Sequence, residues 1–310
     1  MTSDPLSVSK KPVKAARRVL VLGATGMLGH KLVQRLSARG LTVFGTMRSS
    51  SVPNTPAARV ALGAAHMLLP NVDVLQDEAL WEALEAANPD AVINAVGVIK
   101  QLDLAKDSVS SIATNALLPH RVAAFCKKRG ARLIQFSTDC VFAGHKGPYA
   151  ENAPTDAEDL YGRSKLLGEV SGPGCLTIRS SIVGRELRGR SSLVEWFLSQ
   201  RGGQATGFAG ALYTGLTTNV MSDLIGVLVS EHPAVEGVWH VASESISKYE
   251  LLKLINVHYK LGITLGRDDK FFCDRRLDGR NFQKRTGFSA PSWGVMIAEM
   301  HDDPTPYDTE

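Results

Sequence analysis

Short apolar runs and stretches of helical spacing alternate through the N-terminal half of the chain. The run from Arg18 to Leu22 is aliphatic and ends at Gly23, which predicts a strand buried on both faces. The next apolar residues recur at helical spacing until Gly40: Met27, Leu28, Leu32, Val33 and Leu36. A second run, from Leu41 to Met47, follows at once. The three segments together predict a βαβ unit.

The same alternation continues to the middle of the chain. Helices are predicted at 78–87 and at about 108–128, and short strands at 91–94 and 132–137. Helices that alternate with short apolar strands are typical of a parallel, doubly wound sheet of the Rossmann type. The predicted fold class is therefore α/β.

Beyond Arg179 the alternation becomes irregular. Glycines crowd together at positions 202, 203, 207 and 210, and the remaining helices accompany one short strand, Gly237 to Ala242. We expect a Rossmann domain at 18–180 and a smaller, mainly helical C-terminal lobe at 181–301 packed on it, with some exchange of chain between the two. Residues 1–17 are expected to form a flexible tail, and residues 302–310 to be frayed.

Composition narrows the class of protein. The formal charge of +4 owes much to basic residues near the N-terminus, so it does not favour nucleic acid as a partner. No apolar run approaches the roughly 20 residues that cross a bilayer, and the first residues lack the apolar stretch of a secretory signal. We expect a soluble protein with no membrane partner.

The cysteines and the acidic residues do not follow patterns typical of metal ligands. Cys126, Cys140, Cys175 and Cys273 are scattered without a CxxC pair, which favours buried thiols in a reducing cytoplasm. The carboxylates near the C-terminus show no ligand spacing either. We therefore expect no metal site and a cytoplasmic location.

Three glycines follow the first predicted strand at intervals of three residues: Gly23, Gly26 and Gly29. At a strand-to-helix junction, such glycines let backbone N–H groups approach the pyrophosphate of a dinucleotide. The candidate cofactor contacts in this loop are Gly23, Thr25, Gly26, Met27 and Leu28. A glycine-rich turn that binds nothing is the alternative, because the motif also occurs by chance.

The end of the second predicted strand bears on which dinucleotide binds. Rossmann proteins that prefer NAD usually carry an acidic residue there, which holds the ribose 2′-hydroxyl. This chain has Arg48, whose guanidinium is suited to a 2′-phosphate together with Ser49 and Ser50. We predict NADPH, with NADH as the alternative, although Arg48 is also compatible with an exposed loop. Asp73 and Val74 are further candidate cofactor contacts.

Tyr161 and Lys165 lie four residues apart at the start of a predicted helix, 161–170, so both project from one helical face. A phenol has a pKa of about 10, and a nearby ammonium makes it a more effective proton donor near neutrality. Ser137 and Thr138 end a predicted strand and offer hydroxyls to a reacting carbonyl; Thr138 is the preferred third member. An amphipathic surface pair is the alternative for Tyr161 and Lys165.

Three segments carry a resemblance to a known family: Gly-Ala-Thr-Gly-Met-Leu-Gly at 23–29, Ser-Thr-Asp at 137–139 and Tyr-Gly-Arg-Ser-Lys at 161–165. Together they resemble the extended short-chain dehydrogenase/reductases, and within these the dTDP-4-dehydrorhamnose reductase family. The similarity extends from about residue 18 to residue 300. It implies reduction of the 4-keto group of a 6-deoxyhexose carried on a nucleotide diphosphate.

The resemblance also assigns roles to individual residues. It implies catalysis by Thr138, Tyr161 and Lys165. It also implies that Asn94, Ala95 and Val96 lie along the cofactor and that Asn115 lies near the active site. Cys140 stands where the family usually has an aromatic residue against the substrate, so the identity of the sugar is left open.

The C-terminal lobe is where the family binds its nucleotide sugar. The candidate substrate contacts are Cys140, Arg179, Arg185 and Tyr213, with Thr214 nearby; Arg188 is better explained as a solvated surface residue. Two other functions stay open. One is an epimerase or dehydratase that retains its cofactor, and the other is a non-catalytic regulator resembling the β subunit of methionine adenosyltransferase. A homodimer is a further expectation from the family.

Overall fold

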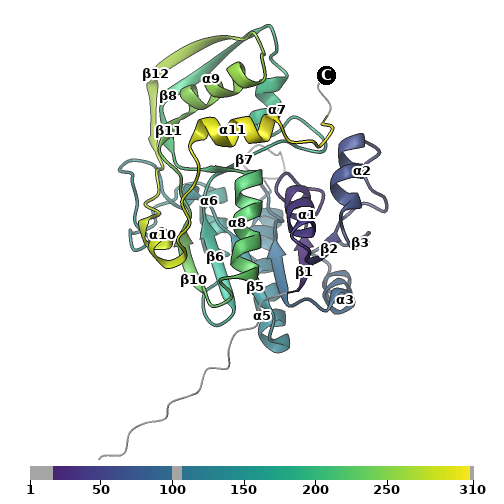
Figure 1. The fold of residues 1–310 in the computed structure, drawn as a ribbon. Coiled ribbons are helices and arrows are strands. Elements are labelled where there is room, and N and C mark those ends of the chain that lie inside the picture. Colours follow the sequence, from purple (N-terminus) through teal and green to yellow (C-terminus); the bar gives the residue numbers. More distant parts are fainter. Residues whose placement is uncertain (1–16, 100–106, 308–310) are drawn as a thin grey trace, which may run out of the picture.

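A seven-stranded parallel sheet forms the centre of the protein, in the strand order β10-β6-β5-β4-β1-β2-β3 (Figure 1). Its strands are β1 Arg18–Leu22, β2 Thr42–Thr46, β3 Met67–Leu69, β4 Ala91–Asn94, β5 Arg132–Phe136, β6 Cys175–Arg179 and β10 Gly237–His240. The computed structural model describes residues 17–99 and 107–307. The expected tail at 1–17 thus lies outside the described residues, apart from its last residue. The predicted doubly wound α/β sheet is confirmed.

Helices cover both faces of this sheet and bury a separate core on each. In β1, Val19 and Val21 pack into the core of one face, and Leu20 and Leu22 into the core of the other. Successive residues of a strand point to opposite faces, so a strand covered on both sides is apolar throughout. The helices are α1 Gly29–Ala38, α2 Pro56–Gly63 and α8 Thr218–Ser230 on the first face, and α3 Asp77–Ala87 and α5 Leu118–Arg129 on the second.

The predicted helix at 108–128 is not one regular α-helix. It consists of α4 Ser108–Ser111, a π-helical turn at Ile112–Leu117, and α5. Pro119 has no N–H to donate to the carbonyl of Asn115, four residues earlier, which accounts for a widened turn at this point. The turn places Asn115 where α6, Leu160–Leu167, packs against it.

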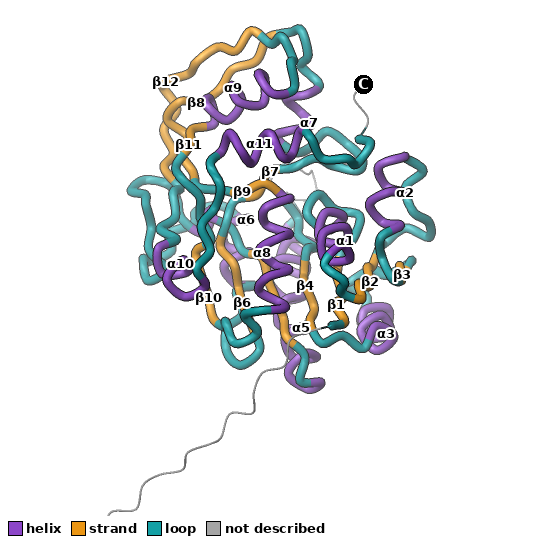
Figure 2. The backbone as a smooth tube through the Cα atoms, viewed as in Figure 1, coloured by secondary structure: helices purple, strands orange, loops and turns teal. Residues whose placement is uncertain are grey.

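The smaller lobe lies beyond the carboxyl ends of the sheet and contains more strand than its sequence suggests (Figure 2). Its main sheet has the order β11-β8-β12. The elements are β7 Ile182–Val183, α7 Leu193–Leu198, β8 Gln204–Tyr213, β9 Leu216–Thr217, β11 Ile246–Ser247, α9 Lys248–His258, β12 Thr264–Asp274, α10 Arg280–Thr286 and α11 Trp293–His301. Strands β8 and β12 are parallel neighbours along most of their length.

Two of the crowded glycines lie inside β8 and not in a loop. A Cβ on Gly207 would come within 2.7 Å of the Tyr249 backbone, and one on Gly210 within 2.5 Å of the Phe271 carbonyl. Glycine at these positions lets α9 and β12 approach the strand closely. The glycines therefore mark close packing, where the sequence had indicated only irregular structure.

The chain returns from the smaller lobe to the Rossmann sheet. Helix α8 packs on α1, and β10 pairs in parallel with β6 at the edge of the sheet. Figure 1 shows α1 and α8 side by side on one face. A boundary at residue 180 therefore does not divide the chain cleanly, and residues 218–240 complete the nucleotide-binding domain.

The expectation that residues 302–310 are frayed is wrong for the part that the structure describes. The Asp303 side chain is only 5% exposed and accepts a hydrogen bond from the ammonium of Lys31 at 2.9 Å, and Thr305 is buried beside it. A buried ammonium is unfavourable without a carboxylate close by, so the ion pair between Lys31 and Asp303 holds the segment in place. Residues 308–310 lie outside the described residues.

Candidate active site

The glycine loop joins β1 to α1 at the carboxyl edge of the sheet. Gly23 has a φ of +79°, and its carbonyl accepts a hydrogen bond from the N–H of Gly26 at 3.0 Å. A Cβ on Gly29 would lie 2.0 Å from that carbonyl oxygen, so the helix can begin here only with glycine. Gly26 is exposed, and Thr25 and Met27 are half-buried, which leaves the loop backbone accessible to a ligand.

The end of β4 lies directly beside this loop. The Asn94 side chain accepts a hydrogen bond from the N–H of Val96 at 3.2 Å and donates one to Gln135 at 2.8 Å. A Cβ on Gly23 would come within 2.9 Å of the Val96 side chain. The predicted contacts at 94–96 thus lie beside the glycine loop, with Asn94 buried and Ala95 and Val96 partly exposed.

The other predicted cofactor residues differ in their surroundings. Arg48 is exposed just beyond β2 and is followed by Ser49, whose hydroxyl donates to the Ser51 carbonyl at 2.7 Å. The Asp73 carboxylate accepts a hydrogen bond from the N–H of Leu75 at 3.0 Å and so closes a turn. The side chains of Val74 and Leu28 are buried in the two cores, so any contact they make with a ligand is through the backbone.

Tyr161 and Lys165 project from α6 toward the end of β5. The Lys165 ammonium donates a hydrogen bond of 2.5 Å to the carbonyl of Phe136, the last residue of that strand. Burial lowers the pKa of Lys165 to about 8, against the opposing effect of Glu169. The structure therefore brings the lysine to the strand end that carries Ser137 and Thr138.

The Tyr161 phenol reaches the same strand end. Burial raises its pKa, the nearby Cys140 adds to the effect, and a hydrogen bond with Thr138 opposes it. The Thr138 hydroxyl also accepts a bond from the N–H of Cys140 at 3.1 Å. Thr138, Tyr161 and Lys165 are thus brought together as the sequence predicted.

Asn115 connects the catalytic helix to the loop after β4. Its side chain accepts from the N–H of Val98 at 2.9 Å, donates to the carbonyl of Val98 at 3.0 Å, and donates to the Ser164 hydroxyl at 3.2 Å. A Cβ on Gly97 would lie 3.4 Å from the Asn115 oxygen and 3.9 Å from the Lys165 ammonium. Asn115 therefore holds the loop against the residues that flank Tyr161.

Glycine at position 162 belongs to the same arrangement. A Cβ there would lie 2.2 Å from the Cys140 carbonyl, so α6 can approach the 138–140 segment only because residue 162 has no side chain. The helix begins at this point because the Asp159 carboxylate caps it, accepting from the N–H of Gly162 at 2.7 Å. Both interactions place Tyr161 beside Thr138.

Arg179 does not have the surroundings expected of a substrate contact. It is buried, and its guanidinium donates two hydrogen bonds of 2.7 Å to the Glu169 carboxylate. The Ser137 hydroxyl donates to the same carboxylate at 2.6 Å. This pair satisfies the charge of the arginine inside the protein and supports the β5 and β6 ends, so the structure gives no support to the predicted contact between Arg179 and the substrate.

Arg185 also has a carboxylate partner. It is buried, donates a hydrogen bond of 2.6 Å to Glu195, and lies over the ring of Tyr307 at 4.6 Å. These contacts place it between α7 and the C-terminal segment, and they give no support to its predicted contact with the substrate. Arg188 is exposed.

Tyr213 and Cys140 lie close to the catalytic group. Tyr213 is buried, and its hydroxyl has no hydrogen-bond partner among the described residues. Burial raises its pKa, and the charge of Asp139 adds to the effect, which places the phenol near the Ser-Thr-Asp segment. The Cys140 sulfur accepts a hydrogen bond of 3.6 Å from Arg275.

Two cations beside this segment were missed by sequence reasoning. Lys248, the first residue of α9, lies over the Tyr213 ring at 4.4 Å, and burial lowers its pKa while Asp139 opposes the shift. Arg275 follows β12 and donates to the Phe142 carbonyl at 2.9 Å. No local motif marks either residue. Only the tertiary fold brings them to the active site.

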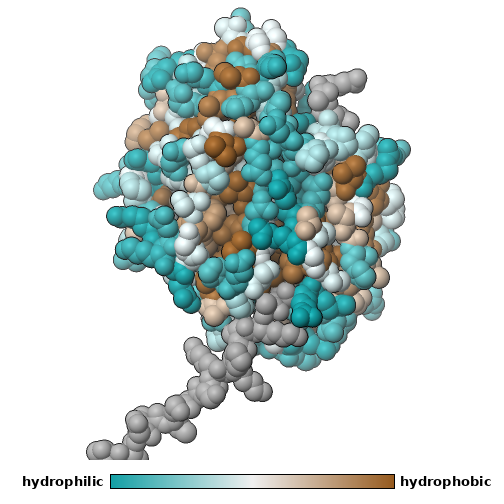
Figure 3. Space-filling model, in the orientation of Figure 1, coloured by the Kyte–Doolittle hydropathy of each residue, from teal (hydrophilic) through white to brown (hydrophobic). Residues whose placement is uncertain are grey.

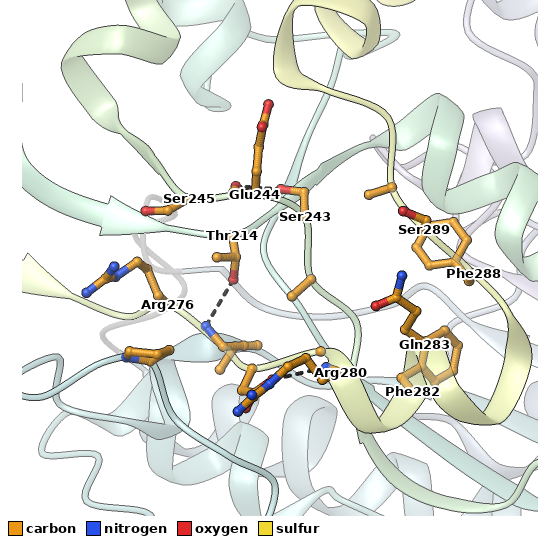
Figure 4. Close-up of a pocket in the computed structure, with 16 residues that line it drawn as sticks. Thr214, Ser243, Glu244, Ser245, Arg276, Arg280, Phe282, Gln283, Phe288 and Ser289 are labelled. Atoms are coloured by element: carbon orange, nitrogen blue, oxygen red, sulfur yellow. Dashed lines mark hydrogen bonds and ion pairs between the residues drawn. The ribbon is translucent and has the colours of Figure 1, made fainter.

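A cavity of about 480 Å³ lies beside α10 (Figure 4). Its lining includes Thr214, Ser243, Gln283 and Phe288, but neither Tyr161 nor any other residue of the catalytic group among those described. The two arginines that border it are occupied, Arg276 by Asp274 and Arg280 by Asp278. The cavity is therefore distinct from the catalytic site.

Among the described residues, no helix is long and apolar enough to span a membrane, and no three His, Cys, Asp or Glu side chains are grouped as metal ligands. On the face shown in Figure 3, hydrophobic residues appear in separate groups between hydrophilic ones. Neither observation changes the description of the site.

The fold and the site define the class of protein. A Rossmann sheet with a glycine loop after β1, and with Tyr161 and Lys165 beside Thr138, is the arrangement of a short-chain dehydrogenase/reductase. More particularly, the chain belongs to the family described as the RmlD substrate binding domain, whose model matches residues 17–261. The family resemblance seen in the sequence is confirmed.

Individual relatives agree with this assignment. The chain is 30% identical over 241 residues to a probable dTDP-4,6-dihydroxy-2-methyloxan-3-one 4-ketoreductase of Streptomyces antibioticus, covering 76% of this chain and 74% of the relative. It is 33% identical over 153 residues to the dTDP-4-dehydrorhamnose reductase of Streptomyces griseus, a match that spans 49% of this chain and only 43% of the relative.

A solved structure shows the same fold. The dTDP-4-dehydrorhamnose reductase of Bacillus anthracis, in complex with NADP, aligns with a TM-score of 0.74 at 20% identity and covers 93% of this chain and 98% of its own. At this identity the likeness concerns the fold.

Proposed function

We propose that this protein is an NADPH-dependent reductase of the 4-keto group of a nucleotide-diphosphate 6-deoxyhexose, acting in deoxysugar or cell-surface polysaccharide biosynthesis. The observation that carries the proposal is the group at the end of β5, where the Tyr161 phenol is hydrogen-bonded with Thr138 and Lys165 is anchored on Phe136. The names of the relatives support the same reaction.

The described residues fit a dinucleotide. The accessible loop at 25–27 offers backbone N–H groups to a pyrophosphate at the start of α1, and the Gly23 and Gly29 positions admit no side chain. Asn94, Ala95 and Val96 continue this surface toward Lys165. When bound, the nicotinamide supplies the hydride. Arg48, exposed beyond β2, is the proposed contact with a 2′-phosphate and the reason to favour NADPH over NADH.

Thr138 and Tyr161 act on the carbonyl oxygen of the sugar. Their hydroxyls orient this oxygen, and Tyr161 donates its proton to it as the carbonyl carbon is reduced to an alcohol. Because burial raises the pKa of the phenol, Tyr161 is protonated at neutral pH and available as the acid. The Lys165 ammonium, on the same face of α6, stabilises the phenolate left behind, which then recovers a proton from solvent.

The substrate is held by residues that the fold adds to this group. We propose that Lys248 and Arg275 present positive charge to the nucleotide diphosphate, and that Cys140 and the Tyr213 hydroxyl border the sugar. We leave Arg179 and Arg185 out of this list because their charges are already paired with Glu169 and Glu195.

A direct assay tests the reaction. The protein is mixed with NADPH and a panel of nucleotide 4-keto-6-deoxysugars while the absorbance of the reduced cofactor is followed. We expect NADPH oxidation with at least one member, and a loss of about 100-fold or more in Tyr161→Phe. Isomerised product without NADPH consumption would indicate an epimerase, and NADPH binding without turnover across the panel would indicate a regulatory protein.

We also propose that the protein forms a homodimer through α4, the π-helical turn and α6. These neighbouring elements carry four exposed apolar side chains: Val109, Ile112, Leu117 and Leu167. Exposed apolar residues gathered on adjacent helices are typical of an interface. Light scattering should give twice the mass of the chain, and Leu167→Glu should give the single mass, while Val257→Glu on α9 should not. A monomeric parent protein would exclude this interface.

We propose a cytoplasmic location. The support is that none of the four cysteines, all in described parts of the chain, forms a disulfide. Fractionation of the producing cell tests this, and recovery outside the cytoplasm would contradict it.

A further inference from the structure

The segment after α11 is hydrogen-bonded to the first turn of α1. Residues 303–307, called the C-terminal strap below, contact α1 and α8 of the Rossmann domain and Arg185 of the smaller lobe. Nothing in the proposed reaction uses these residues. Their contacts are nevertheless polar and largely shielded from solvent, which indicates a specific role for the segment.

Lys31 anchors the strap. Its side chain is only 2% exposed, and its ammonium donates to Asp303 at 2.9 Å, to Thr305 at 3.2 Å and to Gln34 at 2.7 Å. The second oxygen of Asp303 accepts a bond of 2.8 Å from Asn219 on α8. All three protons of the ammonium have acceptors, so this buried charge is compensated only when the strap is docked.

The end of the strap reaches the glycine loop through one histidine. The two ring nitrogens of His30 lie 2.9 Å from the Gly26 carbonyl and 2.7 Å from the Tyr307 hydroxyl. A carbonyl only accepts, so Nδ1 donates to Gly26, and the neutral ring must then accept the Tyr307 proton at Nε2. Burial lowers the pKa of His30 to about 4, which keeps the ring neutral at physiological pH. The result is a series of two hydrogen bonds in which Tyr307 donates to His30 and His30 donates to the Gly26 carbonyl.

Tyr307 also connects the strap to the smaller lobe. The Arg185 guanidinium lies 4.6 Å from the centre of the Tyr307 ring and is held on its other side by Glu195, which belongs to α7. The Tyr307 side chain is thus fixed between Arg185 of the smaller lobe and His30 of α1. Such a position suits a residue that orients the glycine loop through His30.

We propose that the C-terminal strap is a positioning element for the dinucleotide: through Tyr307 and His30 it fixes the Gly26 carbonyl, and so sets the orientation of the backbone N–H groups that bind the pyrophosphate. The proposal rests on the dinucleotide site proposed above and adds a positioning element to it. Residue 307 lies far from the glycine loop in sequence, and no motif connects the two.

Tyr307→Phe tests the proposal with the smallest change, because it removes one hydroxyl and keeps the ring under Arg185. Direct fluorescence titration should give a Kd for NADPH raised about 10-fold, the effect expected when one buried hydrogen bond is lost and its partner left unsatisfied. Tyr249→Phe is the matched control, since this tyrosine on α9 packs under Arg267 outside the strap. It should bind NADPH as the parent protein does.

Two variants of His30 test its two hydrogen bonds separately. His30→Asn places an amide N–H near the position of Nδ1, keeping the bond to Gly26 and losing Tyr307; adding Tyr307→Phe to it should then weaken binding no further. His30→Gln keeps a group near Nε2 and should lose the bond to Gly26. Additive losses in the double variant would show that Tyr307 acts independently of His30 and would overturn the proposal.

Hydrogen exchange of the ligand-free protein keeps this test separate from the cofactor proposal. Tyr307→Phe should speed exchange of the amides at 24–29 at least several-fold and leave those of β12 unchanged. If the parent protein does not bind NADPH but the exchange difference is present, the strap fixes the glycine loop as proposed, and it is the cofactor assignment of that loop, with the strap's role toward the dinucleotide, that fails. Unchanged exchange together with an unchanged Kd would overturn the strap. So would a lower melting temperature as the sole effect, since that would indicate a structural contact only.

Discussion

At Gly29 the absence of a side chain determines the shape of the cofactor loop. Its ideal Cβ position lies 2.0 Å from the Gly23 carbonyl oxygen and 2.9 Å from the carbonyl carbon, both backbone atoms that no rotamer change can move. Gly63, at the end of α2, has nothing within 4 Å of the same position and has no positive φ. The two glycines therefore form a matched pair, one required and one free to change.

Gly29→Ala should displace the loop from α1. We expect a loss of about 2 kcal/mol or more in the free energy of unfolding, because overpacking against backbone forces a shift of the main chain, and no measurable binding of NADPH. Gly63→Ala should keep the parent Kd and gain slight stability from the higher helix propensity of alanine. Chemical denaturation and NADPH titration measure both. Parent-like binding by Gly29→Ala would remove the loop from the cofactor site.

Lys165 leads to a pH prediction. Its pKa is lowered to about 8, so the ammonium is charged below that pH and is lost as the pH rises through it. Because the charge stabilises the Tyr161 phenolate, kcat/KM should fall on the alkaline side of about pH 8. Lys165→Met should lower kcat/KM about 100-fold or more at neutral pH and abolish this alkaline limb. The same limb in the variant would assign it to another group.

The π-helical turn at Ile112–Leu117 is the element that most shapes the catalytic group. It brings the Asn115 side chain to the 97–98 segment and to Ser164 on the next turn after Tyr161. On the other side, a Cβ on Gly168 would lie 1.9 Å from the Asn115 carbonyl, so α6 packs directly on the widened turn. A regular helix would not present the same carbonyl and amide together.

Asn115→Ala tests this element. It removes all three side-chain bonds and should lower kcat about 10- to 100-fold through misplacement of the loop beside Lys165, with a smaller change in KM. Ser164→Ala removes only the bond between the two elements and should lower kcat by less. Steady-state kinetics compare the two variants. Equal losses, or a change in KM alone, would argue against a positioning role.

Elements encoded by local patterns were predictable from sequence, and those that depend on distant partners were not. The run at β1, the glycine spacing and the Tyr161 to Lys165 interval each lie within a few residues, so periodicity and motif identify them. The π-helical turn depends on one missing N–H at Pro119, and the glycines of β8 on contacts with α9 and β12. Neither cause appears in the pattern of apolar positions.

At the scale of the whole molecule, side chains distant in sequence meet at the catalytic centre and at the strap. Arg179 and Arg185 pair with Glu169 and Glu195, and this pairing is visible only in three dimensions, so the sequence could not show that both charges are compensated inside the protein. Lys248 and Arg275 reach the Ser-Thr-Asp segment from α9 and from the end of β12. Their approach is likewise a property of the fold.

Two buried histidines should make the stability of the protein sensitive to mild acid. Burial lowers the pKa of both His30 and His240 to about 4 from 6.5. Between these values the unfolded chain binds protons that the folded protein does not, so the free energy of unfolding falls as the pH falls from 6.5 toward 4. The loss is at most about 3 kcal/mol for each histidine.

His240→Asn provides the test. An asparagine amide can keep the donor bond that His240 Nδ1 makes to the Tyr149 carbonyl, 3.0 Å away, but it does not titrate. Urea denaturation at pH 7 and pH 5 should show a smaller acid loss in the variant than in the parent protein. An equal loss in both would assign the acid sensitivity to other groups.

The transfer of hydride to the sugar is the central claim, and its most direct test follows one atom. The protein is incubated with a nucleotide 4-keto-6-deoxysugar accepted in the NADPH assay and NADPH that carries two deuterium atoms at C4 of the nicotinamide, and the sugar product is analysed by mass spectrometry and NMR. One deuterium at C4 of the sugar is predicted, formed at least about 100-fold more slowly by Tyr161→Phe. A product without deuterium, or equal rates for the parent protein and the variant, would contradict the proposed reductase.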